Sequence, residues 1–142
     1  MIKNKMLIPI TLGATVLAII LNFQELLSGS QATFKNLIVT LAYLAVWLVV
    51  LFIGSKKKSQ CTIKYICVFW LITLAVSLLT LYVNFFDATV NWAIPFVIVF
   101  LGPLYGARFF VSTMLAAALE LAIVSFILTA LGFLLLKRIK QA

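Results

Sequence analysis

Five long stretches of this chain contain no charged residue, apart from one glutamate in the last of them. They cover 6–24, 36–55, 65–86, 88–107 and 109–136, and the exception is Glu120. A helix of about 20 apolar residues crosses the ~30 Å hydrocarbon core of a bilayer, so each stretch is long enough to cross about once. Only 10% of the 142 residues are charged, whereas a soluble domain carries roughly a quarter. The sequence therefore predicts an all-α integral membrane protein rather than a soluble one.

The distribution of basic residues reduces the five stretches to four predicted crossings. Cytoplasmic loops hold an excess of lysine and arginine. Four crossings place nine basic residues inside and two outside, whereas a fifth crossing at 88–107 would make the split seven to four. We therefore expect one domain, 1–142, folded as an antiparallel four-helix transmembrane bundle with cytoplasmic N- and C-termini. The nine inside residues are Lys3, Lys5, Lys56, Lys57, Lys58, Lys64, Lys137, Arg138 and Lys140, and the two outside are Lys35 and Arg108.

The predicted spans are about 6–24, 36–55, 65–86 and 110–136. Lys3 and Lys5 ahead of an apolar run are also how a cleavable secretory signal begins. We expect a retained first helix instead, because no compact soluble domain follows it. Sparse loops and a composition rich in lysine but poor in acids indicate a bacterial plasma membrane.

The segment 92–106 is predicted not to cross. Pro95 opens it and Gly102-Pro103 breaks it, which leaves only the run 96–101 between the two prolines. Apolar stretches this short are more often re-entrant or interfacial than spanning. Backbone groups freed at Gly102-Pro103 must bond to protein or to a water-lined cavity, because lipid offers no hydrogen bonds. A structural cap over the outer mouth, a re-entrant element that lines a substrate path, and a fifth span remain open.

Small and polar residues recur every three or four positions in each predicted helix, which places them on one face. Helices in lipid associate through such faces by close packing and hydrogen bonds. The faces of the first three helices hold Thr11, Thr15, Ala18 and Asn22; Asn36, Thr40, Tyr43, Trp47 and Gly54; and Trp70, Thr73, Ser77, Thr80, Asn84 and Asp87.

The last span has two such faces. The outer half adds Thr113, Ala116, Ala117 and Glu120, and Glu120 points about 160–200° away from Ala118. Either this helix is surrounded within one bundle, or its second side meets another copy or a partner subunit. The predicted helix-packing face in the inner half is Ala118, Ala122, Ser125, Thr129 and Gly132.

Glu120 is the only acidic or basic residue deep inside a predicted span. A charge there costs at least about 2.5–3.5 kcal/mol and marks a functional site by default. A neutral carboxyl group bonded to hydroxyls would hold the bundle together, whereas a titrating one reached by water would couple protons or cations. The groups expected at similar depth are Tyr43, Ser77 and Thr80, with Thr113 further out.

Two further charged features have structural and functional interpretations. We expect an outer ion pair between Asp87 and Arg108 that pins 92–106 to the third helix, with an anion-attracting entrance around Arg108 as the alternative. The cluster of Lys56, Lys57, Lys58 and Lys64 is expected to keep the loop between the second and third spans in the cytoplasm. Each such residue adds on the order of 1 kcal/mol of attraction to anionic lipid headgroups.

Several function classes are excluded by the residues present. The chain has no histidine, which removes the commonest general base and nucleophile activator. The cysteines Cys61 and Cys67 are too few for a zinc site and are expected to be packing residues. We therefore expect no enzyme, no metal and no cofactor. Nucleic-acid binding is not expected either, because the basic residues flank the membrane rather than form a soluble face.

Two functions remain. The first is a non-catalytic accessory, regulatory or immunity-type subunit that docks on a larger membrane complex through the last helix. The second is a small oligomeric transporter or channel in which Glu120 is the coupling carboxylate. The partners expected are the lipid bilayer and either a second copy or a larger membrane protein.

Overall fold

The fold, seen in a computed structural model that describes residues 7–141, is helical and contains no strand within that range. Between the last two long helices, the chain forms a series of short helical turns over 91–109, called here the 91–109 segment. It comprises a turn at Asn91–Ala93, α4 (Ile94–Phe96), a π-helical turn at Val97–Leu101 and a 3₁₀ stretch at Gly102–Phe109. The four long helices are α1 (Leu7–Ser28), α2 (Phe34–Lys56), α3 (Gln60–Phe86) and α5 (Met114–Gln141).

Within residues 7–141, five helical segments are long and apolar enough to cross a membrane: the four long helices and Asn91–Phe109. The prediction of an all-helical membrane protein is therefore confirmed at this level. Each long helix extends beyond its charge-free stretch at one end or at both. α5 begins at Met114 and not at 110, because the Thr113 hydroxyl accepts a hydrogen bond from the Ala116 N–H.

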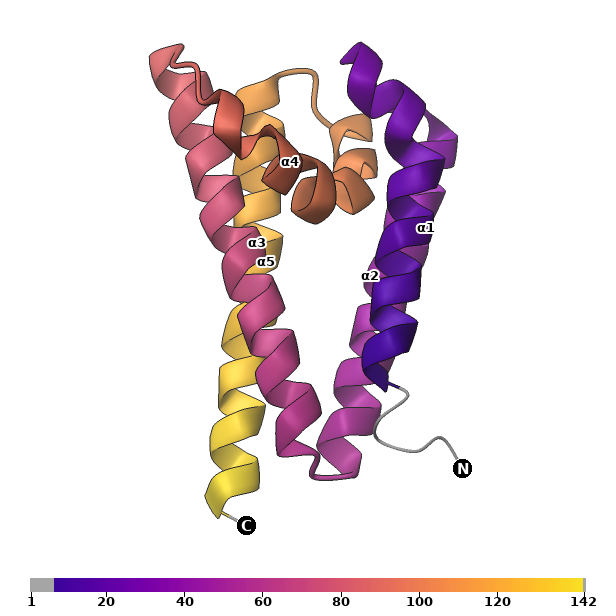
Figure 1. Cartoon of the computed structure of the whole chain (residues 1–142), viewed down its shortest axis with the longest axis vertical. Helices are drawn as coiled ribbons and strands as arrows, with labels where there is room; N and C mark the ends of the chain where they lie inside the picture. The colour runs from indigo at the N-terminus through magenta and orange to yellow at the C-terminus, as the bar shows by residue number, and fades with distance from the viewer. Residues whose placement is uncertain (1–6, 142) are drawn as a thin grey trace.

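The long helices form two pairs, α1 with α2 and α3 with α5 (Figure 1). The pairs meet at the end where α2 turns into α3, the lower end of Figure 1, and the 91–109 segment lies between them at the upper end. α3 ends and α5 begins at this same upper end, so the segment returns to the side from which it started. It contacts helices of both pairs.

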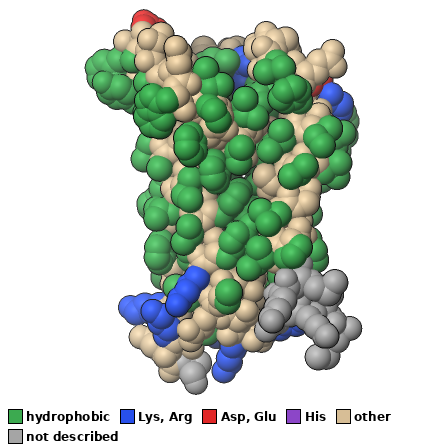
Figure 2. Space-filling view, in the orientation of Figure 1, with side chains coloured by type: hydrophobic (Ala, Val, Ile, Leu, Met, Phe, Trp, Pro, Cys, Tyr) green, Lys and Arg blue, Asp and Glu red, His purple; other side chains and the backbone are tan. Residues whose placement is uncertain are grey.

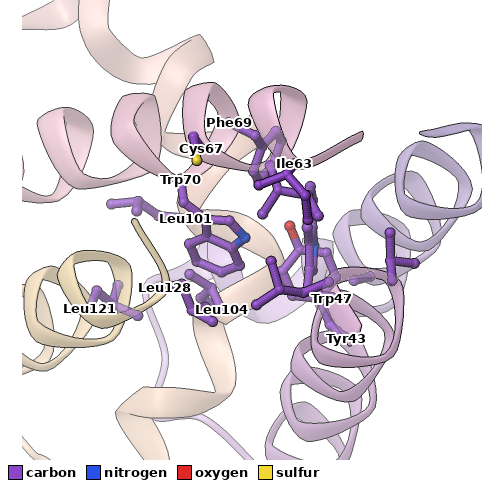
Figure 3. Packing of buried hydrophobic residues seen from close by; sticks show 14 of the residues in the cluster. Tyr43, Trp47, Ile63, Cys67, Phe69, Trp70, Leu101, Leu104, Leu121 and Leu128 are labelled. Atoms are coloured by element: carbon purple, nitrogen blue, oxygen red, sulfur yellow. The ribbon is translucent and has the colours of Figure 1, made fainter. Parts of the chain in front are cut away.

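Aromatic side chains join the two pairs below the 91–109 segment (Figure 3). Trp47 of α2 stacks on Phe69 of α3, with ring centroids 4.4 Å apart, and meets Trp70 edge-on at 5.5 Å. Phe100 of the 91–109 segment adds a ring 5.2 Å from Phe69. Each such pair contributes about 0.5–1.5 kcal/mol beyond its buried area. The centre of the fold is therefore packed with side chains from three elements.

α5 packs on α3 through the face of small residues that the sequence picks out. Ala118, Ala122, Ser125, Thr129 and Gly132 are all buried. A Cβ atom at Gly132 would lie 2.7 Å from the Cys67 sulfur, so the two helices approach closely there. The rest of the outer surface is largely apolar, and the visible basic side chains gather mainly at the lower end (Figure 2).

Candidate functional site

A buried polar network holds the 91–109 segment against α1 and α2. Asn22 of α1 is fully buried, and its Nδ2 donates to the carbonyl oxygens of Gly102 at 3.0 Å and Pro103 at 3.4 Å. Its Oδ1 accepts a hydrogen bond from Nδ2 of Asn36 at 3.0 Å. The Asn36 Oδ1 in turn accepts from the Thr33 backbone N–H at 2.8 Å and so caps the start of α2. Two asparagines thus link two helices to the broken backbone.

Thr40 completes this network from the next turn of α2. Its hydroxyl donates to the Pro103 carbonyl at 2.9 Å and accepts from the Gly106 N–H at 2.9 Å. Pro103 has no N–H of its own, and the carbonyl groups of Gly102 and Pro103 accept hydrogen bonds from side chains of α1 and α2. The requirement that protein or water bond the backbone at Gly102-Pro103 is met by protein.

Gly106 lies so close to α2 that no larger residue fits. A Cβ atom there would be 2.1 Å from the Asn36 carbonyl oxygen and 2.7 Å from the Thr40 hydroxyl oxygen. The first of these obstacles is helix backbone, which cannot rotate away as a side chain can. Glycine is therefore required at this position by contact distance.

Arg108 anchors the C-terminal end of the segment to the loop between α1 and α2. Its Nη1 donates to the carbonyl oxygens of Gly29 at 3.3 Å and Ser30 at 3.2 Å, and to the Tyr105 hydroxyl at 2.7 Å. The Tyr105 hydroxyl in turn donates to the Ser30 carbonyl. Gln31 donates from Nε2 to the Arg108 carbonyl at 2.7 Å.

The predicted ion pair between Asp87 and Arg108 is wrong. Asp87 is exposed and terminates α3 in a left-handed conformation, with φ of 50°. The guanidinium of Arg108 is held instead by carbonyl groups on the α1–α2 side. Within residues 7–141 the one salt bridge joins Lys35 to Glu25 at 2.7 Å.

Glu120 does not meet the hydroxyl groups expected at its depth. Tyr43 accepts a hydrogen bond from Thr15 at 3.4 Å. Ser77 and Thr80 donate to carbonyls of their own helix, and Thr113 caps α5. The Glu120 side chain is half-buried, and its Oε2 is inaccessible and without a hydrogen-bond partner in the described part of the chain.

A cavity of about 150 Å³ lies beside Arg108, between the 91–109 segment, α3 and α5. Arg108 is nine-tenths buried, and its Nε is inaccessible and has no hydrogen-bond partner in the structure. The other polar side chains on its wall are Thr80, Asn84 and Tyr105, and the apolar ones are Leu26, Val97, Leu101, Leu104, Met114, Ala117, Ala118 and Leu121.

The described residues contain no group of three or more cysteine or acidic side chains that could hold a metal ion. No family model, curated protein or solved structure matches this chain.

The sequence reasoning missed how Asn22, Asn36 and Thr40 act together. All three lie on the predicted polar faces, and the need for hydrogen bonds at Gly102-Pro103 was recognised. A usable signal is that Asn22 lies near the end of one helix and Asn36 near the start of the next, so both lie at the end of the bundle where the break at 102–103 also has to lie. The sequence does not show that Asn22 and Asn36 contact each other.

Proposed function

We propose that the four long helices cross the membrane and that the 91–109 segment enters and leaves on the outer side. The placement of its two ends on the same side of the bundle supports this arrangement, as do its bonds to Asn22 and Thr40. The opposite end carries the lysine cluster at 56–58 and the basic end of α5, which favours a cytoplasmic position. Lys3 and Lys5, which were counted for the same side, lie outside the described residues. The membrane proposed is the plasma membrane of a bacterium.

The two cysteines test this orientation without any added label site. Cys61 is exposed next to the lysine cluster, and Cys67 is buried. We expect a membrane-impermeant maleimide to label inverted vesicles strongly and right-side-out vesicles weakly, and C61S to remove the signal from both. Stronger labelling of right-side-out vesicles would reverse the proposed orientation.

For the activity, we propose a non-catalytic accessory or regulatory subunit that docks on a larger membrane complex through the Glu120 side of α5. The observation that carries this proposal is the Glu120 side chain, which is half-buried on the face of α5 opposite the one that contains Gly132 and makes no hydrogen bond within the described residues. A carboxyl group at this depth requires a bonding partner, because lipid supplies none. The α3 contact occupies the face that contains Gly132, so the opposite face of α5 is available to another protein.

The alternative, an oligomeric transporter with Glu120 as the coupling carboxylate, requires water to reach that residue. Glu120 does not line any of five cavities found within residues 7–141. The centre between the helix pairs is filled by the aromatic rings around Trp47. These observations favour docking over transport.

Site-specific photocrosslinking distinguishes the two functions. Ile127 lies two turns from Glu120 on the same side of α5 and is exposed, whereas the equally exposed Val16 of α1 serves as a control. We expect a crosslinker at 127, but not at 16, to trap one larger membrane protein. E120L should reduce that product about tenfold, equivalent to ~1.4 kcal/mol, which is the size of one hydrogen bond between membrane helices. E120Q, which keeps hydrogen-bonding groups, should retain more of it than E120L.

Each remaining outcome counts against the docking proposal. Lipid adducts alone at both positions would mean that this side of α5 faces the bilayer. A product of twice the mass of this chain would identify a second copy and favour the oligomeric transporter. In that case E120Q should abolish proton- or cation-dependent flux in reconstituted vesicles.

A further inference from the structure

The cavity beside Arg108 combines a buried cation with an apolar wall. The guanidinium is nine-tenths buried, yet the described residues place no carboxylate against it. Carbonyl oxygens satisfy Nη1, but they carry only partial charges and leave Nε unbonded. A buried charge without a full counter-charge is costly. This imbalance indicates that an anion completes the site.

The hydrogen-bond donors that remain on the wall suit an oxyanion. The Tyr105 hydroxyl already donates to Ser30, and the Thr80 hydroxyl already donates to Val76. Asn84 uses one of its two amide hydrogens on the Thr80 carbonyl, so one is left. The Arg108 guanidinium, whose Nη2 makes no hydrogen bond within the described residues, and the second Asn84 N–H have no acidic partner, as binding of a phosphate oxygen requires.

The size and position of the cavity decide what carries the anion. At about 150 Å³ it is smaller than the 300–1,000 Å³ of pockets that enclose whole ligands, so it fits only part of a molecule. Its remaining wall is apolar, and Met114 on this wall is exposed at the surface. An acyl chain can therefore continue from the site onto the apolar outer surface.

We propose that this cavity binds the phosphate headgroup of an anionic phospholipid, with Arg108 and Asn84 as its ligands. The site lies on the outer half of the bundle and is separate from Glu120, which does not line it. The proposal is therefore independent of docking through α5. The bound lipid closes the junction between the 91–109 segment, α3 and α5.

The test uses the full chain in nanodiscs of phosphatidylcholine, with and without 30% phosphatidylglycerol. We expect the anionic lipid to raise the Tm of the wild type by about 5 °C through preferential binding to the folded state. Native mass spectrometry should retain one phosphatidylglycerol on the protein. K137Q, at the opposite basic end, is the control and should keep both effects.

Two variants separate lipid binding from the structural bonds of Arg108. R108Q should lose the lipid-dependent part of the Tm as well as some basal stability. M114W, which keeps Arg108 and fills the exposed side of the cavity, should keep its basal Tm and lose the lipid effect. A phosphatidylglycerol shift that persists in both variants would overturn the proposal. An equal shift from inorganic phosphate in pure phosphatidylcholine would identify a free-anion site instead of a lipid site.

Discussion

Replacement of Gly106 by alanine is expected to prevent the 91–109 segment from packing against α2. The added Cβ would lie 2.1 Å from the Asn36 carbonyl oxygen and 2.5 Å from its carbonyl carbon. Overpacking of a tight core typically costs about 1–3 kcal/mol. Here the obstacle is the backbone of a membrane helix, so we expect a loss of about 3 kcal/mol or more. The separation of the segment from α2 would also break the bond between the Gly106 N–H and Thr40.

Gly13 provides the matched control for this substitution. It lies within α1, and a Cβ there would meet no atom within 4 Å. G13A should therefore leave the fold intact and, because alanine favours helix by about 1 kcal/mol over glycine, should not destabilise it. The measurement is unfolding in mixed micelles by SDS titration, followed by tryptophan fluorescence. Equal stability of G106A and G13A would show that the close approach at Gly106 is wrong.

Replacement of Asn22 by leucine is expected to have the second large effect. Leucine has a similar size, but it leaves the Gly102 carbonyl and the Asn36 amide without their partners. Each buried polar group left unsatisfied costs about 1–3 kcal/mol. With two such groups, we expect N22L to lower the free energy of unfolding by about 2–6 kcal/mol. T129V is the control, because the buried Thr129 hydroxyl bonds only a carbonyl of its own helix, and it should cost well under 1 kcal/mol.

A double-mutant cycle checks that the effect belongs to the network. N36L alone removes the partner of Asn22 and the cap at Thr33. N22L and N36L together should cost less than the sum of the two single changes, with a coupling of about 0.5–3 kcal/mol. Additive effects would mean that the two amides stabilise the fold independently, contrary to the geometry.

The stability losses expected for G106A and N22L bear on function because both residues hold the 91–109 segment in place between the helix pairs. Asn22 and Gly106 attach the 91–109 segment to α1 and α2, and the proposed lipid site attaches it to α3 and α5. A rigid outer closure of this kind agrees with a subunit that presents a stable surface to a partner. On the side of α5 that faces away from α3, the Glu120 carboxyl group makes no hydrogen bond within the described residues.

Sequence patterns predicted the class of fold and the packing faces of individual helices. Steps of three and four residues identified Thr11, Thr73 and Ser77 as inward-facing, and all three are buried. The same rule cannot assign partners, because it places residues around one helix axis and contains no information about the neighbouring helix. For this reason the pattern places Tyr43 and Ser77 beside Glu120, although Tyr43 accepts a hydrogen bond from Thr15 and Ser77 donates one to the Thr73 carbonyl.

The predicted ion pair failed for a related reason. Asp87 and Arg108 flank the same segment in sequence, and attraction between opposite charges made them natural partners. The actual partner of Arg108 depends on which helix pair the C-terminal end of the 91–109 segment approaches. Close contact of Gly106 with α2 carries Arg108 to the Gly29 and Ser30 carbonyls instead.

The sequence by itself determined that this chain forms helices long and apolar enough to cross a membrane, because hydropathy adds up residue by residue. Long, predominantly apolar stretches favour a bilayer over water, and this preference does not depend on which helices pack together. Only the tertiary structure decided which polar groups satisfy one another, because hydrogen bonds depend on distances between atoms far apart in the chain. Asn22 and Gly102 are separated by 80 positions, and the fold alone brings them together.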